Sequence, residues 1–204
     1  MTTSTRERIV TESLRLFADR GYAATSVAEI EAAAGLSPGA GGLYRHFRSK
    51  EEVLAAAVRE HITRTREQIA SVMEIAGDFA GRPLEVRLKM ACKAGLAKMR
   101  EEQDLIRVLF RDLDQFPHLV AEMREGIVNP LYDSIATWLG SQPEYDDADE
   151  DWPAIASVLG GAVVNYWLSN ESLYESPTRV DETRFVDGWV RLALGLVAAE
   201  HSPA

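Results

Sequence analysis

Two helix starts in close succession within residues 21–50 constrain the fold of this chain more than any other feature. Ser26 followed by Glu29 forms a capping box, in which each residue bonds the other's backbone N–H, so a helix is predicted to begin at about Val27. Its apolar stripe consists of Val27, Ile30 and Ala34. Gly35 supplies the left-handed residue at which such a helix ends, which limits it to about two turns.

A second helix is predicted directly after this stop. Ser37 is a favourable N-cap, and Pro38 suits the first helical position, where a missing N–H costs nothing. Leu43 and Phe47 lie four residues apart and are expected to anchor this helix to the first one. The outer face would then consist of residues 38–42 together with Tyr44, Arg45 and His46.

Two short helices joined by a tight turn are typical of a helix-turn-helix. The residues in order are Thr25, Val27, Ile30, Ala34-Gly35-Leu36-Ser37, Leu43-Tyr44-Arg45-His46-Phe47 and Ser49-Lys50-Glu51. This series closely resembles the N-terminal domain of TetR-family transcriptional regulators, over about residues 5 to 60. One departure stands out, because the family usually has two residues fewer between the turn glycine and the tyrosine than lie between Gly35 and Tyr44.

The resemblance implies which residues meet DNA. Sequence reading is expected from the start of the second helix and its exposed side, namely Ser37, Pro38, Gly39, Ala40, Gly41, Gly42 and Arg45. Phosphate contacts are expected from Thr25, Tyr44, His46 and Lys50, and Ser26 is also placed at the interface. The alternative for Tyr44 and His46 is that their rings only pack the domain.

The glycines allow two interpretations. Three glycines in a helix interior would cost about 2–3 kcal/mol against alanine, so something else must order this segment. Either the bare backbone lies close against DNA in the major groove, or the turn is two residues longer and the helix starts nearer Ala40.

Helical patterns without strand alternation fill the rest of the chain, so the predicted fold class is all-α with about nine helices. The predicted helices cover about residues 4–21, 49–77, 84–100, 105–113, 119–138 with a break near Pro130, 152–172 and 182–199. We expect a three-helix DNA-binding domain at residues 1–48 and a larger ligand-binding and dimerisation domain at residues 49–204.

The net charge of −10 hides an uneven distribution. Residues 1–64 carry 9 basic and 8 acidic side chains, whereas the remainder carries 13 basic and 24 acidic ones. Between Ala32 and Lys50 there is no acidic residue, so the local field at the expected DNA face is positive.

The last two helices are apolar over a wider arc than one core requires. A second subunit would cover the excess, as the TetR resemblance also implies, and Gly160-Gly161 would permit a close backbone approach. The residues expected at this interface are Ile155, Leu159, Gly160, Val163, Tyr166, Phe185, Trp189, Leu192 and Leu196. The alternative is a buried pair within one subunit.

A mostly apolar small-molecule effector is expected in the middle of the chain, on resemblance and on adaptable apolar side chains. The candidate lining residues are Met90, Met99, Phe110, Phe116, Met123, Trp138, Asn165 and Trp167. Ordinary core packing is the competing interpretation for this set.

Several other classes of site are disfavoured. The histidines are scattered, and Asp147, Asp149 and Asp151 lack the glycine and glutamate of a calcium loop, so we expect no catalytic site, metal or cofactor. Cys92 is expected to be a small buried side chain rather than a redox sensor. No membrane span or secretory signal is found, which predicts a cytoplasmic protein without a membrane partner.

Taken with the resemblance, these features predict a homodimeric, ligand-responsive repressor that binds palindromic operator DNA. The alternative is an all-helical small-molecule-binding protein whose helix-turn-helix serves only as a packing or protein-contact module.

Overall fold

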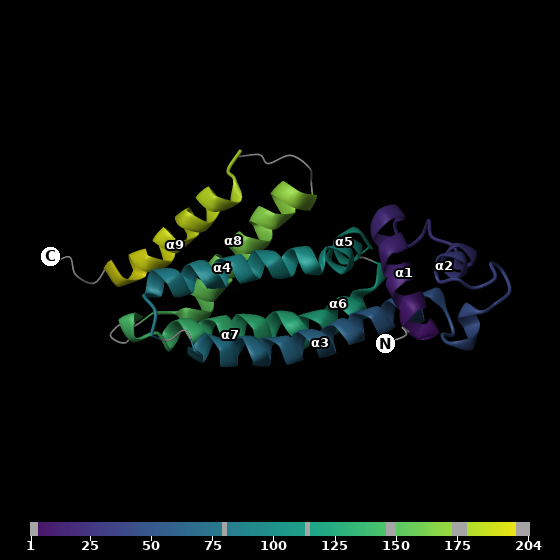
Figure 1. Ribbon diagram of the computed structural model, residues 1–204, viewed down its shortest axis with the longest axis horizontal. Coiled ribbons are helices and arrows are strands. Elements are labelled where there is room, and N and C mark those ends of the chain that lie inside the picture. The colour runs from purple at the N-terminus through teal and green to yellow at the C-terminus, as the bar shows by residue number, and fades with distance from the viewer. Residues whose placement is uncertain (1–3, 79–80, 113–114, 146–149, 173–178, 199–204) are drawn as a thin grey trace. The chain divides into compact units, whose positions relative to one another are not determined.

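The computed structural model describes residues 4–78, 81–112, 115–145, 150–172 and 179–198, and over these residues the chain is helical without strands (Figure 1). The all-α prediction is confirmed. The chain divides into two compact units, unit 1 of residues 1–67 and 102–127 and unit 2 of residues 68–101 and 128–204.

Unit 1 contains the predicted N-terminal domain and two helices from later in the chain. Its elements are α1 (Thr5–Arg20), α2 (Val27–Ala33), the 3₁₀ turn η1 (Leu43–Arg45), the first part of α3 (Lys50–Asp78), α5 (Gln103–Asp112) and α6 (Pro117–Met123). Helix α5 packs on α1. Unit 1 therefore extends beyond residue 48. The predicted boundary at that residue between a DNA-binding and a ligand-binding domain stays a prediction.

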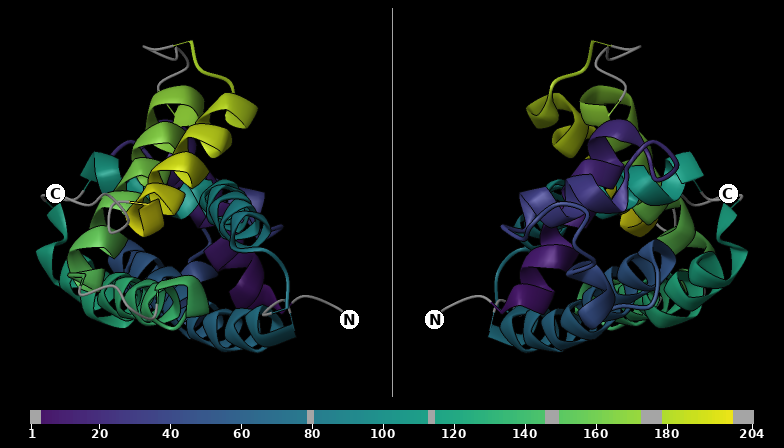
Figure 2. Two further views of the ribbon diagram at one scale, coloured as in Figure 1. Left: turned by 90° about the vertical axis from the view of Figure 1, so that its left-hand side faces the viewer. Right: turned by 90° about the vertical axis from the view of Figure 1, so that its right-hand side faces the viewer.

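Unit 2 is a set of packed helices that surrounds α8. Its elements are the end of α3, α4 (Leu84–Glu101), α7 (Asn129–Gly140), the 3₁₀ turn η4 (Pro143–Tyr145), α8 (Trp152–Trp167) and α9 (Glu182–Ala198). Helix α8 contacts α4, α7 and α9, and α8 and α9 run beside each other (Figures 1 and 2). The expected break near Pro130 corresponds to a π turn, η3 (Arg124–Val128), before α7.

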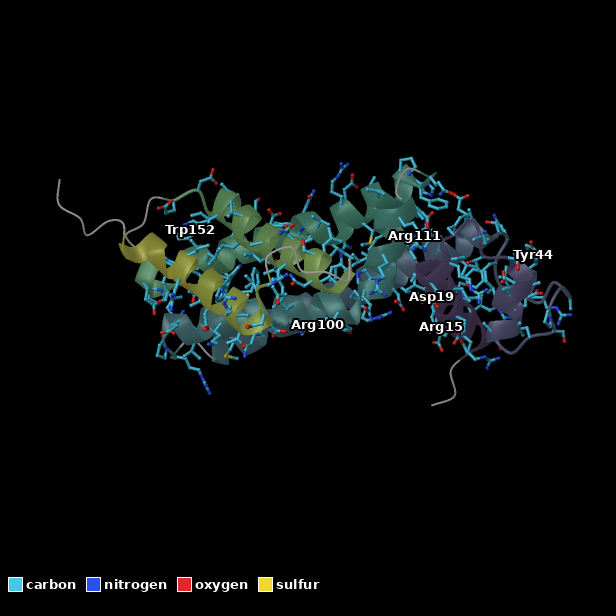
Figure 3. All side chains as sticks on the ribbon, turned by 90° about the horizontal axis from the view of Figure 1, so that it is seen from above. Arg15, Asp19, Tyr44, Arg100, Arg111 and Trp152 are labelled. Atoms are coloured by element: carbon cyan, nitrogen blue, oxygen red, sulfur yellow. The ribbon has the colours of Figure 1, made fainter. Side chains whose placement is uncertain are left out.

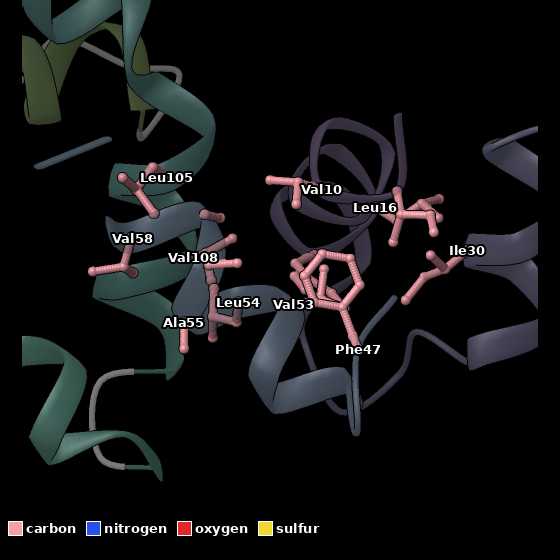
Figure 4. Packing of buried hydrophobic residues seen from close by; sticks show 14 of the residues in the cluster. Val10, Leu16, Ile30, Phe47, Val53, Leu54, Ala55, Val58, Leu105 and Val108 are labelled. Carbon is pink, nitrogen blue, oxygen red and sulfur yellow. The ribbon is translucent and has the colours of Figure 1, made fainter. Parts of the chain in front are cut away.

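The core of unit 1 joins residues from every one of its helices (Figure 4). Val10 and Leu16 come from α1, Ile30 from α2, and Leu105 and Val108 from α5. Because α5 contributes to this core, burial of its apolar face holds α1 in place. The start of α3 adds Val53, Leu54, Ala55 and Val58.

Unit 2 is fixed by aromatic side chains whose polar ends find backbone partners. The Tyr145 hydroxyl donates to the Ala193 carbonyl at 2.8 Å, and the Trp189 indole N–H donates to the Leu159 carbonyl at 2.9 Å. Gly160 lies against Tyr132, whose Cε1 would be 2.8 Å from a Cβ added at this glycine. Gly160 is therefore required by packing within the chain.

Cys92 is buried on α4, where desolvation, followed by the charge of Glu182, raises the pKa of its thiol to about 12. Since the thiolate is the reactive form, this thiol is unreactive at neutral pH, as expected for a small buried side chain. Within the described residues, no helix has both the length and the apolar character of a membrane span.

Candidate nucleic-acid interface

Helix α2 begins as the capping box predicts. The Ser26 hydroxyl accepts from the Glu29 N–H at 3.3 Å, and the Glu29 carboxylate accepts from the Ser26 N–H at 2.8 Å. These bonds, backbone first, hold the pKa of Glu29 below its ordinary value, and an ion pair with Arg20 adds to them. The helix ends before Gly35, whose φ is +74°.

The predicted second helix from Pro38 is wrong. Residues 37–42 form a turn, and regular structure resumes only with the 3₁₀ helix at Leu43–Arg45. Gly39 and Gly41 both have a φ of +74°, a left-handed conformation that an α-helix cannot contain. The longer turn is thus closer to the structure than the helix with three interior glycines, and the helix starts later than Ala40.

A buried carboxylate orders this turn. Glu31, on the inner side of α2, is 0% exposed. Its Oε2 accepts from the Gly39 N–H at 2.7 Å, and its Oε1 accepts from the Leu43 N–H at 3.0 Å. The carboxylate therefore bonds one N–H group within the turn and the N–H group of the residue that directly follows it.

Exposed polar side chains follow the turn. Tyr44 is 57% exposed (Figure 3), and Arg45 and His46 are also exposed. Leu43 and Phe47 are buried in the core of unit 1, which confirms the predicted anchors. The burial of these two apolar side chains fixes the direction in which Tyr44, Arg45 and His46 point away from the core.

The remaining residues expected at the DNA face lie on or near the surface. Ser26, Ser37, Pro38, Gly39 and Ala40 are exposed, and Gly41 and Gly42 are partly exposed. With no side chain beyond a Cβ from residue 39 to 42, this part of the turn offers a partner mainly backbone groups.

Thr25 and Lys50 instead make contacts inside unit 1. Thr25 is 1% exposed, and its hydroxyl donates to the Gly21 carbonyl at 2.9 Å. The Lys50 ammonium donates to the carbonyls of Tyr22 at 2.7 Å and Thr25 at 2.8 Å, and lies 4.2 Å from the Tyr22 ring centroid. Burial lowers the pKa of Lys50, and the charge of Asp112 opposes that effect. The expected phosphate contact by the Thr25 hydroxyl is therefore corrected to an internal one.

Sequence reasoning missed Glu31 and the contacts of Tyr22. Glu31 lies four residues after Val27 and three before Ala34, on the apolar stripe, and that spacing could have revealed a buried carboxylate. Asp112 accepts from the Tyr22 N–H at 3.2 Å, and Phe116 packs edge-on against the Tyr22 ring at 4.7 Å between centroids. No local signal in the sequence links these distant residues to Tyr22.

The expected effector residues do not gather in one unit. Phe116 is buried in the core of unit 1 and Met123 packs against it, whereas Met90, Met99, Trp138, Asn165 and Trp167 belong to unit 2. The side chain of Phe110 lies outside the described residues. Trp167 is buried and its indole N–H has no hydrogen-bond partner among the residues that the structure describes, whereas Met90 and Asn165 are exposed. An effector pocket stays a prediction.

Four of the nine residues expected at a dimer interface are buried within the single chain. These are Leu159, Val163, Tyr166 and Trp189, while Ile155 and Phe185 are partly buried. Gly160 packs against Tyr132, and Phe185 stacks on Tyr166 at 4.1 Å between centroids. The side chain of Leu196 lies outside the described residues. Of the expected set, Leu192 alone is described as strongly exposed, at 73%.

Asp147 and Asp149 lie outside the described residues, and Asp151 caps α8 by accepting from the Ala154 N–H at 3.1 Å. Over the described ranges, no group of three or more histidine, cysteine, aspartate or glutamate side chains is arranged to hold a metal ion.

The N-terminal part of the chain is similar to known regulatory proteins. Residues 9–57 match the family model described as bacterial regulatory proteins, tetR family. YerO of Bacillus subtilis, an HTH-type transcriptional regulator, is 36% identical over 107 residues. That match covers 52% of this chain and only 35% of YerO, so the chain spans about a third of that relative.

Two further similarities extend over nearly the whole chain. The HTH-type transcriptional activator FasR of Mycolicibacterium smegmatis is 24% identical over 199 residues, covering 93% of this chain and 81% of FasR. The crystal structure of a TetR-family regulator from Mesorhizobium loti superposes with a TM-score of 0.70 at 21% identity, covering 96% of each chain. At that identity, the superposition supports the fold alone.

Proposed function

This chain belongs to the TetR family of bacterial regulatory proteins, and we propose that it is a DNA-binding transcriptional regulator that acts as a homodimer controlled by a small molecule. The observation that carries the proposal is the direction of Tyr44, Arg45 and His46, which follow the turn at residues 37–42 and point away from the core. No acidic residue lies between Ala32 and Lys50, so this surface suits a polyanion.

We assign separate tasks to the three exposed side chains. The Tyr44 hydroxyl and the His46 imidazole donate to phosphates and set the position of the domain on the duplex. Arg45 offers the paired donors that recognise guanine in the major groove. Thr25 and Lys50 support these residues from inside unit 1, because their hydroxyl and ammonium bond backbone carbonyls.

Selection of bound fragments from a random genomic library tests the proposal, followed by gel shifts on the enriched sequence. A palindrome with half-sites about 34–36 Å apart, or a multiple of that, is expected for a two-fold symmetric dimer. Binding should weaken steeply with salt, because each phosphate contact releases counterions. If no sequence is enriched and no shift occurs, the helix-turn-helix serves only as a packing or protein-contact module.

Arg45→Ala tests whether Arg45 recognises a base or only contributes positive charge. We expect it to lose about 1–3 kcal/mol of discrimination between the selected site and a site changed at one base pair. Arg15→Ala is the matched control, because Arg15 is exposed on α1 and pairs with Glu12 and Asp19. Equal losses in the two variants would contradict base reading by Arg45.

The proposed dimer uses the outer faces of α8 and α9 rather than their buried sides. Val158 and Leu192 are 70% and 73% exposed, well above the other exposed large apolar residues of unit 2. Among the described residues, no atom beyond the chain neighbours and the helix's own nearby backbone lies within 4 Å of a Cβ added at Gly161, Gly188 or Gly195, so another backbone can approach there. Gly188, Leu192 and Gly195 follow at spacings of four and three on one side of α9.

Leu192→Glu tests this surface by sedimentation velocity at several protein concentrations. A buried carboxylate at the interface should convert the dimer to monomer, because an unpaired charge is costly to desolvate. Thr183→Glu is the control, since Thr183 is exposed on α9 and its position in the sequence places it on the opposite side of the helix from Leu192. A Leu192→Glu protein that stays dimeric rejects the surface.

Control by a small molecule is the part of the proposal that rests most on family membership. Helix α3 runs from Lys50 beside the turn into unit 2, so a change in unit 2 can reach the DNA-binding surface through it. Spin labels on the two DNA-binding heads of a dimer should change their separation when a compound releases the DNA. An unchanged separation would exclude α3 as the coupling element.

The sign of regulation is a separate prediction. Repression is expected, but FasR is described as an activator. A reporter gene placed behind the selected site distinguishes the two, since deletion of the regulator raises expression in one case and lowers it in the other.

A further inference from the structure

We propose that Glu31 is the positioning residue for DNA sequence reading, and that it acts through the backbone of the turn without touching DNA. This inference rests on the proposed DNA-binding function. The carboxylate bonds the N–H groups of Gly39 and Leu43, which lie within the turn and directly before Tyr44.

The two bonds fix the tip of the turn and the residue that follows the turn. Gly39 follows Pro38 at the tip of the turn, and Leu43 is the first residue of η1, which carries Tyr44 and Arg45. A rigid carboxylate that accepts from both N–H groups holds them at a set separation. The starting point and direction of η1 therefore depend on Glu31.

The glycines leave the turn little else to order it. Gly39 and Gly41 adopt a φ of +74°. Among the described residues, a Cβ added at Gly39 would meet no atom within 4 Å, and one added at Gly41 would meet only the Tyr44 ring, at 3.9 Å. Glycine has the greatest conformational freedom of any residue, so such a segment is mobile unless it is bonded. Gly42 is the exception, because its Cβ position lies 3.2 Å from Leu36 Cδ1 and 3.8 Å from Glu31 Oε1.

The charge of Glu31 would be unfavourable here without such a role. It is a fully buried acidic side chain directly below a surface that otherwise lacks acidic residues from Ala32 to Lys50. Burial of a carboxylate is costly unless hydrogen bonds satisfy it, and both of its oxygens are bonded to the turn. The buried charge thus ties the turn to α2 instead of serving an ion pair on the surface.

Glu31→Gln is the decisive variant, because it keeps the shape and replaces one acceptor oxygen by a donor that faces an N–H. The affinity for the selected operator should fall about tenfold or more. The affinity for scrambled DNA and its salt dependence should change less than about twofold, since non-specific binding depends on the positive charge of the domain, which this substitution does not reduce. Glu12→Gln, on α1, removes the same charge from unit 1 and should leave both affinities unchanged.

Amide hydrogen exchange of the unmodified protein provides a test that does not depend on a variant's folding. The N–H groups of Gly39 and Leu43 should exchange more slowly than those of Gly41 and Gly42, which Glu31 does not contact. In Glu31→Gln the protection should disappear at Gly39 and Leu43 while that of α1 persists.

Three results would overturn the inference: unprotected Gly39 and Leu43 amides in the unmodified protein, an unchanged preference for the operator in Glu31→Gln, or equal losses on operator and scrambled DNA. The last would make Glu31 a residue of general stability. If the unmodified protein selects no sequence at all, the proposed function fails, and the exchange measurement still reports whether Glu31 orders the turn.

Discussion

Helix α2 and the turn that follows it begin with the same residue type, yet only one becomes a helix. Ser26 is followed at the third position by Glu29, which returns a bond to the cap, whereas Ser37 is followed by Ala40. Left-handed glycines then interrupt the segment after Ser37. Helix α2 is thus specified by its own sequence, while the turn is specified by a carboxylate from another element.

The largest effect is expected from the anchors of the two segments. Leu43→Ala in the turn and Ile30→Ala in α2 each remove a fully buried side chain and should lower the free energy of unfolding by about 2–5 kcal/mol. Urea unfolding at equal protein concentration measures both. A loss below about 1 kcal/mol for Leu43→Ala alone would mean that the turn is not packed like the helix.

Backbone conformation gives the next effect. Gly39→Ala should destabilise the protein by about 1–2 kcal/mol, because a Cβ is disfavoured at a φ of +74° although space is available. Gly42→Ala should cost less than about 1 kcal/mol, since its φ of −62° suits alanine and the contact with Leu36 is with a flexible side-chain end. Thermal unfolding of the two variants measures both losses of stability. A larger loss for Gly42→Ala would contradict the backbone assignment.

The internal contacts of Lys50 predict an intermediate loss. Lys50→Met removes both hydrogen bonds to the backbone and should cost about 1 kcal/mol, an amount reduced by the partial exposure of the ammonium. Lys93→Met on α4 is the control for charge and should be close to neutral, since Lys93 is exposed. Urea unfolding of both variants at neutral pH is the measurement, and equal effects would show that Lys50 acts only as a surface charge.

The smallest changes in stability are expected from substitution of the two serines, and they differ between Ser26 and Ser37. Ser26→Ala should cost about 0.5–1 kcal/mol through loss of the N-cap, whereas Ser37→Ala should change stability by less than about 0.5 kcal/mol because no helix begins there. The difference is measurable by paired urea titrations. Similar losses would indicate that Ser37 does cap a helix in solution.

The parts of the fold that depend on local signals were predictable. Ser4, Ser26 and Asp151 each accept from an N–H in the first turn of the helix that follows them, and Gly21 and Gly35 follow the ends of α1 and α2. Each of these signals lies within a few residues of the structure it specifies. The turn was not predictable in this way, because its order depends on Glu31.

The surface of unit 2 was only partly predictable for a related reason. A wide apolar arc indicates two contacts, but periodicity cannot tell which stripe is covered by the same chain. Trp189 bonds and packs on α8, so it belongs to the internal core, and Leu192 remains outside. Only tertiary contacts distinguish two neighbouring positions on one helix.

The bonds from the Lys50 ammonium to the carbonyls of Tyr22 and Thr25 bring the first residue of α3 to the chain that precedes α2. These bonds hold together the two ends of the intervening segment, which contains α2 and the turn. A closed segment can change length at small entropic cost, about 0.6 kcal/mol for a doubling, without displacing the helices that flank it. The extra residues before Tyr44 therefore lie in a segment that can be replaced by a longer or shorter one. Sequence preference can diversify there by insertion while the rest of the protein keeps its structure.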